Sequence, residues 1–358
     1  MKKQKVAVAM SGGVDSGVAA ALIVKAGYET AAFHMHLWSE ELKDKIFVNK
    51  CCNTESLETA RKTAEQLNIP FFKVDFLEEI FKKRVVDYFL KEYGLGKTPN
   101  PCMVCNRFIK FGELMDYART LGYDYLATGH HARVKKDKNF HLLMGKDKKK
   151  DQSYFLYSLN QKKLSQVVFP VGGYQKTAVI KMAKKWKLPV AERPESQEIC
   201  FYPEDDYRPF LKRQIKEKII PGEVVNPQGK VIGKHQGLPL YTIGQRHGFR
   251  ITDKGVIGPL YVIDKKVKKN QLVVGFGEEA EKKEFKVKEV SWVSGERPKK
   301  EIRCRVRIRH QGELLECRLK GAKVVLGESE RGVAPGQAAV FYQGEEVLGG
   351  GIIRLDND

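Results

Sequence analysis

Two glycines, two hydroxyls and a carboxylate stand together in Ser11–Ser16, which reads Ser-Gly-Gly-Val-Asp-Ser. An apolar run, Lys5–Met10, precedes them, and a helical run, Val18–Val24, follows. The pattern predicts a turn between a strand and a helix, where glycines can adopt positive φ and several backbone N–H groups converge. A helix N-terminus favours an anion, and the hydroxyls of Ser11 and Ser16 can add hydrogen bonds. We therefore expect this turn to bind the phosphates of a nucleotide.

The lysine that a Walker A loop requires is absent from this turn. In that loop the lysine reaches the β- and γ-phosphates for transfer of the γ-phosphate. The end of the motif recurs at Gly96-Lys97-Thr98, but Lys91 stands where its first glycine belongs. The hexapeptide instead resembles the PP-loop of N-type ATP pyrophosphatases. That resemblance implies cleavage between the α- and β-phosphates, with AMP left on an oxygen of the substrate.

Three cysteines lie in sequence contexts typical of reactive thiols or metal ligands. Cys102 and Cys105 form a C-x-x-C in the proline-containing loop Thr98–Arg107, and Cys200 lies further along the chain. We expect Cys105 near the start of the amphipathic helix Phe108–Leu121 and close to an arginine, which favours its thiolate. Taken alone, C-x-x-C is typical of a redox pair, half a zinc site or half an iron–sulfur site.

The other cysteines give weaker signals. Cys51 and Cys52 are adjacent, which makes them poor joint ligands, and we expect burial or loop packing for them. We expect Cys304 on the apolar face of a strand, where it forms part of a core. We predict no function for Cys317. An odd total of seven cysteines favours thiol or metal chemistry over structural disulfides.

Strands alternate with helices in the first half of the chain, which predicts a parallel sheet with a substrate crevice at the carboxyl ends of its strands. After the first strand and helix, the expected elements are the strand Glu29–His36, the helix Ser56–Leu67, the strand Pro70–Asp75, a helix from Leu77 that ends at Gly94–Gly96, and the strand Tyr125–Thr128.

Beyond Pro203 the pattern changes to short β segments separated by glycine and proline, and from Glu278 onward to alternating strands. We predict an α/β fold with an adenine-nucleotide α-hydrolase-like parallel sheet, helices on both of its faces, a small central β-rich domain and a C-terminal β-barrel. The expected domains are a catalytic domain over residues 1–203, a central domain over 204–277, and the barrel over 278–358.

Four arginines occupy the odd positions of Ile302–Arg309, and apolar residues occupy the even ones. A strand sends every second side chain to the same face, at a spacing of roughly 6–7 Å. The arginines therefore form either the solvated outer face of a barrel or a row that contacts phosphates.

The overall charge and the lack of long apolar stretches limit the classes of function. The chain has 64 Lys and Arg against 44 Asp and Glu, a net charge of +20, which favours a polyanionic partner such as nucleic acid. Nothing in the sequence resembles a membrane span, and the first strand begins too early to leave room for a signal sequence. We expect a cytoplasmic protein with no membrane partner.

Ordered motifs along essentially the whole chain resemble those of the tRNA-specific 2-thiouridylase family. They are Ser11–Ser16, Phe33–Trp38, Cys51-Cys52, Thr98–Pro101 with Cys105–Arg107, Ala127–His130, Lys150–Phe155, Glu198–Phe201, Tyr241–Arg246 and Ala334–Gln337. The resemblance implies ATP-dependent adenylation of O2 of the wobble uridine in tRNA, followed by replacement of that oxygen with sulfur. It implies the tRNAs for Lys, Glu and Gln, and a cysteine desulfurase or sulfur-relay protein as the sulfur donor.

By this resemblance, Cys200 carries a persulfide and Cys105 attacks it, with release of sulfide or formation of a Cys105–Cys200 disulfide. Asp15 holds Mg²⁺ through pyrophosphate oxygens. For Met35, simple core packing is the alternative to a nucleotide contact. The expected ATP contacts are Ala9, Met10, Ser11, Gly12, Gly13, Val14, Asp15, Ser16, Met35 and Gly129.

The resemblance also implies contacts with the anticodon stem-loop, whose single-stranded wobble base can be moved into a pocket at little cost in base pairing. The residues expected at the target base are Asn100, Pro101 and Cys102. Further expected contacts are His130, Lys150, Asp151, Gln152, Arg309, His310 and Gln337.

Cys102 departs from the family pattern, where much of the family has Asp. This chain therefore lacks a carboxylate that could act as an acid, a base or a cation ligand. If Cys102, Cys105 and Cys200 lie close together, they resemble the three-cysteine sites of related tRNA thiolases. Those sites hold a [4Fe–4S] cluster with one open iron. Iron-bound sulfide is thus the alternative to the persulfide route.

Two other functions compete with tRNA thiolation. One is a PP-loop AMP-forming synthetase that acts on a small molecule, which would not explain the three cysteines or the arginine strand. The other is a nonenzymatic RNA-binding protein, which would not require Asp15 and both serines of the loop.

Overall fold

A computed structural model describes residues 3–38, 40–42, 45–47, 53–193 and 199–355, with side chains at all of these except 41–42 and 45–47. Cys51 and Cys52 lie outside the described residues, as do Ser196–Glu198 of the segment before Cys200.

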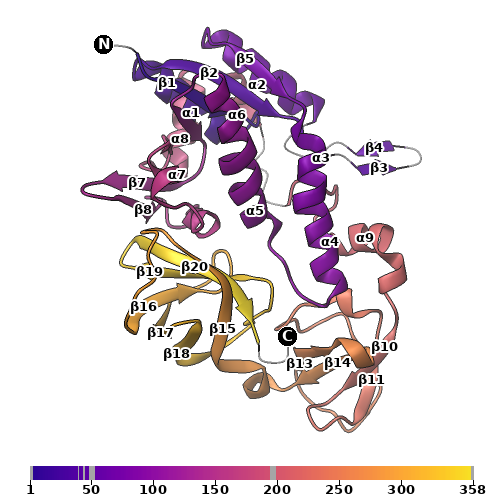
Figure 1. Ribbon diagram of the computed structural model, residues 1–358. Coiled ribbons are helices and arrows are strands. Elements are labelled where there is room, and N and C mark those ends of the chain that lie inside the picture. Colours follow the sequence, from indigo (N-terminus) through magenta and orange to yellow (C-terminus); the bar gives the residue numbers. More distant parts are fainter. Residues whose placement is uncertain (1–2, 39, 43–44, 48–52, 194–198, 356–358) are drawn as a thin grey trace.

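Five parallel strands form the sheet of the N-terminal part, seen in indigo to magenta in Figure 1. Hydrogen bonds join them in the order β5-β2-β1-β6-β9, and each neighbouring pair is parallel. The four strands expected from the sequence are present, and a short fifth strand completes the edge. Their bounds are β1 (Lys5–Ala9), β2 (Glu29–Met35), β5 (Phe71–Val74), β6 (Tyr125–Thr128) and β9 (Val167–Val168).

Both faces of this sheet are buried under helices, because alternate residues of β1 enter two different cores. Val6 and Val8 pack with α1 (Val14–Lys25) and α2 (Thr54–Gln66), and α8 (Lys176–Lys185) packs on α1. Ala7 and Ala9 face the largest core, with the helices that follow β5. Those helices are α3 (Leu77–Phe81), η1 (Lys82–Val86), α4 (Asp87–Gly94), α5 (Pro101–Val104), η2 (Cys105–Leu114) and α6 (Met115–Thr120).

Shorter elements complete the N-terminal part. A hairpin of two short strands extends from it, and its Glu40 is buried against Arg213 at 3.0 Å. The bounds are β3 (Glu40–Leu42), β4 (Lys45–Phe47), η3 (Ser153–Leu156), α7 (Gln161–Leu164) and η4 (Pro189–Glu192).

The central domain is a five-stranded sheet with its own small core, which includes Val224, Val262, Leu272 and Val274. Its strand order is β12-β11-β10-β14-β13. The strands are β10 (Gly222–Val225), β11 (Val231–His235), β12 (Arg250–Ile251), β13 (Tyr261–Lys266) and β14 (Gln271–Gly275). The helical turns are α9 (Tyr207–Gln214), η5 (Lys216–Lys218), η6 (Leu238–Leu240), η7 (Val267–Lys269) and η8 (Gly277–Ala280).

The C-terminal domain is a closed antiparallel barrel of six strands, because β15 pairs with β18 on one side and β20 on the other. The strands are β15 (Glu281–Trp292), β16 (Ile302–Arg307), β17 (Leu315–Lys320), β18 (Lys323–Arg331), β19 (Ala338–Gln343) and β20 (Glu346–Arg354). A hairpin from the N-terminal part, β7 (Ala132–Lys136) and β8 (Phe140–Met144), extends this sheet by pairing with β20. Backbone hydrogen bonds therefore tie the barrel to the N-terminal part.

The arginine strand alternates as predicted but is not an open row of cations. Cys304, Val306 and Ile308 are buried in the barrel core. On the other face Arg307 is also buried, and its Nη1 lies 3.0 Å from Oδ2 of Asp151 in the N-terminal part. Neither alternative, a solvated face or a row that contacts phosphates, holds at Arg307, because the loop around Asp151 covers this end of the strand.

Candidate active site

The turn Ser11–Gly13 connects β1 to α1 at the carboxyl end of the sheet. The first intrahelical bond runs from the Gly17 N–H to the Gly13 carbonyl at 3.1 Å. The N–H groups of the three preceding helical residues therefore have no intrahelical acceptor. Ser16 Oγ donates to the same carbonyl at 2.9 Å and accepts from the Ser11 N–H at 3.3 Å, which holds the turn in shape. The geometry is that of an anion cradle.

Two glycines allow close approach of backbone to this turn. Gly12 has φ of +75°, and a Cβ there would lie 2.3 Å from the Ser56 carbonyl oxygen. Gly129 follows β6, and a Cβ there would lie 2.7 Å from backbone atoms of Asp15 and Ser16. Any side chain at either position would displace the turn, so the end of β6 contacts the start of α1 directly.

A cation and a histidine hold the carboxylate of Asp15. Nζ of Lys176 lies 2.7 Å from each carboxylate oxygen, and Nε2 of His131 lies 3.1 Å from one of them. Both partner side chains are nearly buried, at 11% and 3% exposed. Burial acts to raise the pKa of the Asp15 carboxyl, but the His131 hydrogen bond and the Lys176 charge lower it more, so the pKa lies below its ordinary value. Asp15 is therefore ionised at neutral pH.

Asp15 is suited to a magnesium ion that is also bound by substrate phosphates. Magnesium sites in nucleotide enzymes commonly use one or two carboxylates together with phosphate oxygens and water. The Asp15 side chain is 28% exposed beside the cradle, so its oxygens remain accessible from the nucleotide side. The residues thus fit Mg²⁺ delivered with ATP.

The other expected nucleotide contacts lie at the same end of the sheet. Ala9 ends β1, Met10 donates its N–H to the Phe33 carbonyl at 2.9 Å, and Met35 ends β2. Met35 is half-buried and also packs against the largest core, so the structure agrees with the packing alternative and leaves part of the side chain exposed. Arg193 adds a cation here, with Nη1 3.3 Å from the Gly12 carbonyl oxygen.

The C-x-x-C lies in the first turns of one continuous helix formed by α5, η2 and α6. Asn100 caps it, since Oδ1 accepts the Cys102 N–H at 3.1 Å, and Pro101 occupies the first position, where a missing N–H removes no bond. The predicted helix Phe108–Leu121 therefore begins earlier, at Pro101, which places Cys105 in its second turn.

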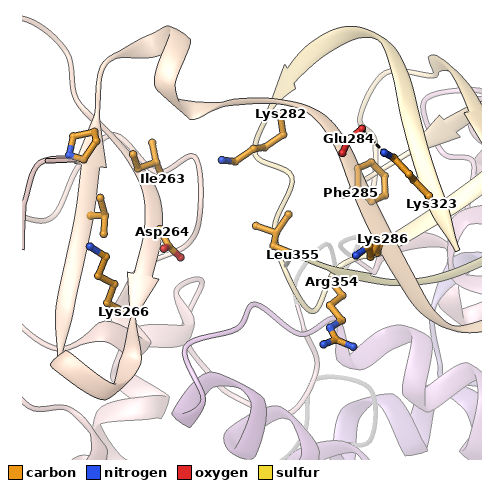
Figure 2. Close-up of a pocket in the computed structure, with 12 residues that line it drawn as sticks. Ile263, Asp264, Lys266, Lys282, Glu284, Phe285, Lys286, Lys323, Arg354 and Leu355 are labelled. Atoms are coloured by element: carbon orange, nitrogen blue, oxygen red, sulfur yellow. Dashed lines mark ion pairs between the residues drawn. The ribbon is translucent and has the colours of Figure 1, made fainter. Parts of the chain in front are cut away.

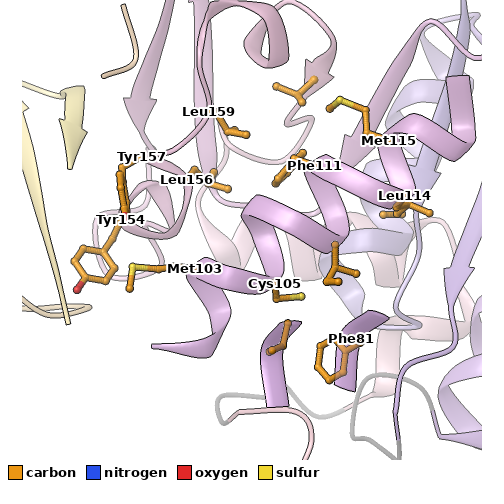
Figure 3. Packing of buried hydrophobic residues seen from close by; sticks show 14 of the residues in the cluster. Phe81, Met103, Cys105, Phe111, Leu114, Met115, Tyr154, Leu156, Tyr157 and Leu159 are labelled. Carbon is orange, nitrogen blue, oxygen red and sulfur yellow. The ribbon is translucent and has the colours of Figure 1, made fainter. Parts of the chain in front are cut away.

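Cys105 and Cys200 border the same apolar cluster. Figure 3 shows the Cys105 sulfur between its own helix and Phe81, and its side chain is 9% exposed. Cys200 is half-buried against this cluster. Its neighbour Phe201 fixes the segment, because its ring lies 6.0 Å from Phe81 and 5.2 Å from Phe89. None of the five described cysteines forms a disulfide.

The three thiols do not form a metal-ligand group in this structure. Three cysteines are a suitable donor set for a [4Fe–4S] cluster. Among the described residues, however, no three His, Cys, Asp or Glu side chains are arranged to hold a metal ion. We therefore derive no step through a cluster.

All three domains meet at Thr98, just before the cysteine helix. The Thr98 N–H donates to the Pro335 carbonyl at 2.9 Å, and the Thr98 carbonyl accepts from Gln337 Nε2 at 2.8 Å. Gly336 permits this approach, since a Cβ there would lie 3.0 Å from the Thr98 backbone. From the central domain, Thr242 Oγ1 lies 3.4 Å from Thr98 Oγ1. The barrel and central domain thus position the loop that leads to Asn100.

Two cavities adjoin this junction, one where the three domains meet and one within the central domain. One of about 390 Å³ includes Thr98, Arg309, Arg331 and Gln337. A second, also about 390 Å³, shares Thr242 with the first and is lined by Tyr207, Arg208, Thr242, Gln245, Arg246 and His247. Together they form a basic trough beside the loop. Arg208 and Arg331 were not expected at this place, and Arg246 stands in a recognised motif for which no role was predicted.

The expected RNA contacts divide into exposed and buried residues. Arg309 is exposed beside the trough, where it also pairs with Glu330 at 3.0 Å, and Lys150 and Gln152 are half-buried. Asp151 is 2% exposed and His130 is 7% exposed. These last two side chains are buried.

The buried members of that set have internal partners instead. Asp151 accepts from the Gly145 N–H at 2.9 Å and pairs with Arg307. His130 lies 2.7 Å from Thr128 Oγ1, and burial lowers its pKa well below the ordinary value. His310 is half-buried and packs on Phe155, with ring centroids 4.3 Å apart.

Sequence reasoning missed Lys176 and His131 as parts of the phosphate site. His131 follows directly after the Ala127–His130 motif, so its position was available as a signal. Lys176 opens a helix 161 residues after Asp15, and no local pattern connects the two.

A separate cavity of about 630 Å³ lies between the central domain and the barrel (Figure 2). Lys266 stands on the central side, while Lys282 and Lys323 stand on the barrel side. Lys323 pairs with Glu284 at 2.8 Å. The lining has five basic and two acidic side chains but no cysteine and no residue of the phosphate turn, so this cavity is not the reaction site.

Within the described ranges, every helix is too short or too polar to span a bilayer.

Three family models match successive parts of the chain. A tRNA methyl transferase HUP domain matches residues 4–204, a tRNA methyl transferase PRC-barrel domain matches 208–276, and an aminomethyltransferase beta-barrel domain matches 282–353. These correspond in order to the parallel sheet, the central sheet and the closed barrel.

Curated relatives named tRNA-specific 2-thiouridylase MnmA match nearly the full length of the chain. The protein from Symbiobacterium thermophilum is 42% identical over 98% of this chain and 92% of its own length. That from Chloroflexus aurantiacus is 43% identical over 97% of this chain and 98% of its own. That from Carboxydothermus hydrogenoformans is 42% identical over 98% of both.

Similarity to solved structures is weaker. An NMN synthetase from Francisella tularensis gives a TM-score of 0.34 at 16% identity, over 58% of this chain and 71% of its own. A 4-thiouridine synthetase in complex with RNA and ATP gives the same score and identity, over 60% of this chain and 51% of its own. We infer nothing about this chain from similarities this weak.

Proposed function

Because the chain belongs to the tRNA-specific 2-thiouridylase family, whose members are tRNA sulfurtransferases, we propose that it makes 2-thiouridine at the wobble position by adenylating the base and displacing AMP with sulfur. Use of ATP accords with the phosphate cradle and the HUP domain.

One observation carries the proposal: a continuous set of contacts joins the phosphate cradle to the cysteine helix. Gly129 lies against the backbone of Asp15 and Ser16. The next residue, His130, packs on Phe111 of the cysteine helix with ring centroids 5.8 Å apart. The cradle for ATP, which donates AMP, and the helix that carries Cys105 are thereby held by one rigid part of the fold, which is the arrangement that a single base undergoing both steps requires.

The first step is adenylation. O2 of the uridine attacks the α-phosphorus of ATP, a new P–O bond forms, and the bond to the β-phosphate oxygen breaks with its electron pair on pyrophosphate. The N–H groups at the start of α1 hold phosphate oxygens, and Asp15 would hold the Mg²⁺ that comes with ATP, which would neutralise phosphate charge. The reason for this step is that a carbonyl oxygen leaves poorly, whereas AMP leaves readily.

The second step transfers sulfur and balances as a thiol exchange. The outer sulfur of a Cys200 persulfide attacks C2, and AMP leaves with the electrons of the C–O bond. The Cys105 thiolate then attacks Sγ of Cys200, the sulfur–sulfur bond breaks, and the sulfur stays on C2. If Cys105 attacks first, hydrosulfide is released and attacks C2 instead. Either order leaves a Cys105–Cys200 disulfide, which an external thiol reduces.

We place the wobble base beside Asn100, Pro101 and Cys102, with the anticodon loop along the basic trough. Three features support this placement. The trough borders Thr98, its arginines come from two domains, and the overall charge of +20 suits RNA phosphates. A persulfide-carrying protein, such as a cysteine desulfurase or a relay protein, supplies the sulfur, and the reaction takes place in the cytoplasm, where tRNA is found.

Transfer of radiolabelled sulfur to purified tRNA tests the proposal. With ATP, a cysteine desulfurase and labelled cysteine, we expect one AMP for each 2-thiouridine formed. Cys200→Ser should lower the rate at least 1000-fold and leave tRNA affinity within about twofold. The matched control is Cys317→Ser, which alters a buried barrel cysteine and should retain activity. Cleavage of ATP without label in tRNA would instead favour a synthetase for small molecules.

A further inference from the structure

We propose that Lys176 is the cation that binds the departing pyrophosphate, in the role that a lysine within the loop fills in Walker A proteins. The inference rests on the proposed function, because it concerns the ATP-cleaving step of that reaction.

Lys176 is placed for this role by its position in the fold. It is the first residue of α8, and its backbone N–H donates to Asp147 Oδ2 at 2.9 Å, which fixes the start of the helix. Its side chain reaches the cradle from that point and is 11% exposed. A lysine so held has little conformational freedom left to lose when a phosphate binds.

The charges at the cradle explain why such a cation is needed. Ser11–Ser16 contains no basic residue, and its one charged side chain is Asp15. An anionic side chain beside a triphosphate is repulsive unless cations compensate for it. Lys176 lies 2.7 Å from both Asp15 oxygens, so without nucleotide the two charges cancel.

Binding of ATP with its magnesium changes the partners of this pair. Asp15 then faces a divalent cation, and Lys176 faces an increased negative charge on the phosphates. The ammonium group has three donors, so Nζ can turn one of them to a phosphate oxygen while it remains beside the carboxylate. As the bond between the α- and β-phosphates breaks, the electron pair moves to an oxygen of pyrophosphate, and Lys176 stabilises that charge without giving up a proton.

Arg193 is the other cation at the cradle, but its contacts suit it less well. Its Nη1 lies 3.3 Å from the Gly12 carbonyl oxygen, and its Nη2 lies 3.7 Å from the Glu55 carboxylate. It therefore supports the backbone of the turn from outside the helix start, whereas Lys176 contacts the side chain that faces the phosphates.

A structural role for Lys176 predicts a different result from a catalytic one. If Lys176 only neutralises Asp15, its removal lowers the stability of the protein and weakens the binding of every ligand of the site alike. If Lys176 binds pyrophosphate, its removal weakens the binding of pyrophosphate but not that of AMP, because AMP lacks the β- and γ-phosphates.

Calorimetric titration of the full-length protein with magnesium pyrophosphate and, separately, with AMP distinguishes these roles. We expect Lys176→Met to bind pyrophosphate about 10- to 100-fold more weakly, the usual effect of losing a charged hydrogen bond, and AMP within twofold of the wild type. The matched control is Lys181→Met, which removes an exposed lysine from the same helix and should bind both ligands normally. If Lys176→Met does not fold, Lys176→Gln retains a donor for Asp15 and tests the charge alone.

Kinetics provide the second readout. Single-turnover formation of AMP on tRNA should slow at least 100-fold in Lys176→Met, with tRNA affinity unchanged. The inference would be overturned if Lys176→Met bound pyrophosphate within threefold of the wild type, or if its affinity for AMP fell as much as its affinity for pyrophosphate. It would also be overturned if the wild-type protein showed no measurable binding of pyrophosphate. If pyrophosphate binding behaves as expected but the wild type transfers no sulfur to tRNA, the proposed function fails and this inference stands.

Discussion

One lysine is buried without a hydrogen-bond partner in the central domain. Lys265 is 9% exposed, and among the described residues nothing accepts a hydrogen bond from its amino group. It lies beneath the loop that leads to Thr98, since a Cβ on Gly96 would be 3.6 Å from its side chain. Burial lowers the pKa of Lys265 from 10.5 to about 7. The folded protein therefore keeps this amine neutral at pH values where the unfolded chain protonates it.

This shift predicts that Lys265→Met stabilises the protein near neutral pH. Between pH 7 and 10.5 the unfolded chain binds the extra proton, so wild-type stability falls as the pH is lowered through this range. Methionine removes that penalty and the unpartnered donor, with an expected gain of about 1–3 kcal/mol at pH 7. The gain should shrink toward pH 10.5.

Urea unfolding at pH 7 and pH 10 measures the effect, with the exposed Lys268→Met as the control. A variant no more stable than the wild type at pH 7, or a gain that increases with pH, would contradict this account of Lys265.

At the residue scale, sequence predicted the groups that are close together in the chain. Ser11–Ser16 and the C-x-x-C could be recognised because turn, helix start and chemistry fall within a few positions. Lys176 could not, because the fold alone brings it to Asp15. Burial of Asp151 and His130 was equally out of reach, since it depends on tertiary packing: Asp151 pairs with Arg307 of the barrel, and His130 packs on Phe111.

At the scale of elements, the loop before the cysteine helix is fixed from outside its own domain. The segment Gly94–Thr98 leaves α4 and passes between the two small domains (Figure 1). Both backbone groups of Thr98 are bound by the turn Pro335–Gln337 of the barrel. The Ala334–Gln337 motif therefore acts through the position of the loop.

We expect Gln337→Ala to loosen this loop and weaken productive binding of tRNA. Loss of one hydrogen bond, worth about 1 kcal/mol, should raise KM for tRNA roughly fivefold and leave KM for ATP unchanged. Steady-state thiolation kinetics measure both constants. The control is Gln343→Ala at the exposed end of β19. An equal rise in KM for ATP would show that the contact acts on the whole site and not on the loop.

Element prediction succeeded where periodicity is local. The parallel strands and the end of the helix at Gly94 follow from apolar spacing and glycine. The β7–β8 hairpin was not expected to join the barrel, because strand pairing between domains leaves no mark in a local pattern.

At the scale of the whole molecule, three folded units place one loop and one basic trough. The net charge of +20 predicted a polyanionic partner, and the structure locates basic side chains in two cavities between the domains. The sequence motifs were sufficient to indicate the family, because many of them occur in the same order. They could not indicate that Arg307 is buried at a domain boundary while Arg309 remains at the surface.

We propose that this chain puts sulfur on the wobble uridine of tRNA. Nucleoside analysis of tRNA from a strain that lacks the gene tests it most directly. We predict that 2-thiouridine disappears from the wobble position, returns with the wild-type gene, and does not return with Cys200→Ser. Unchanged 2-thiouridine in the deletion strain, or full recovery with Cys200→Ser, would contradict the account.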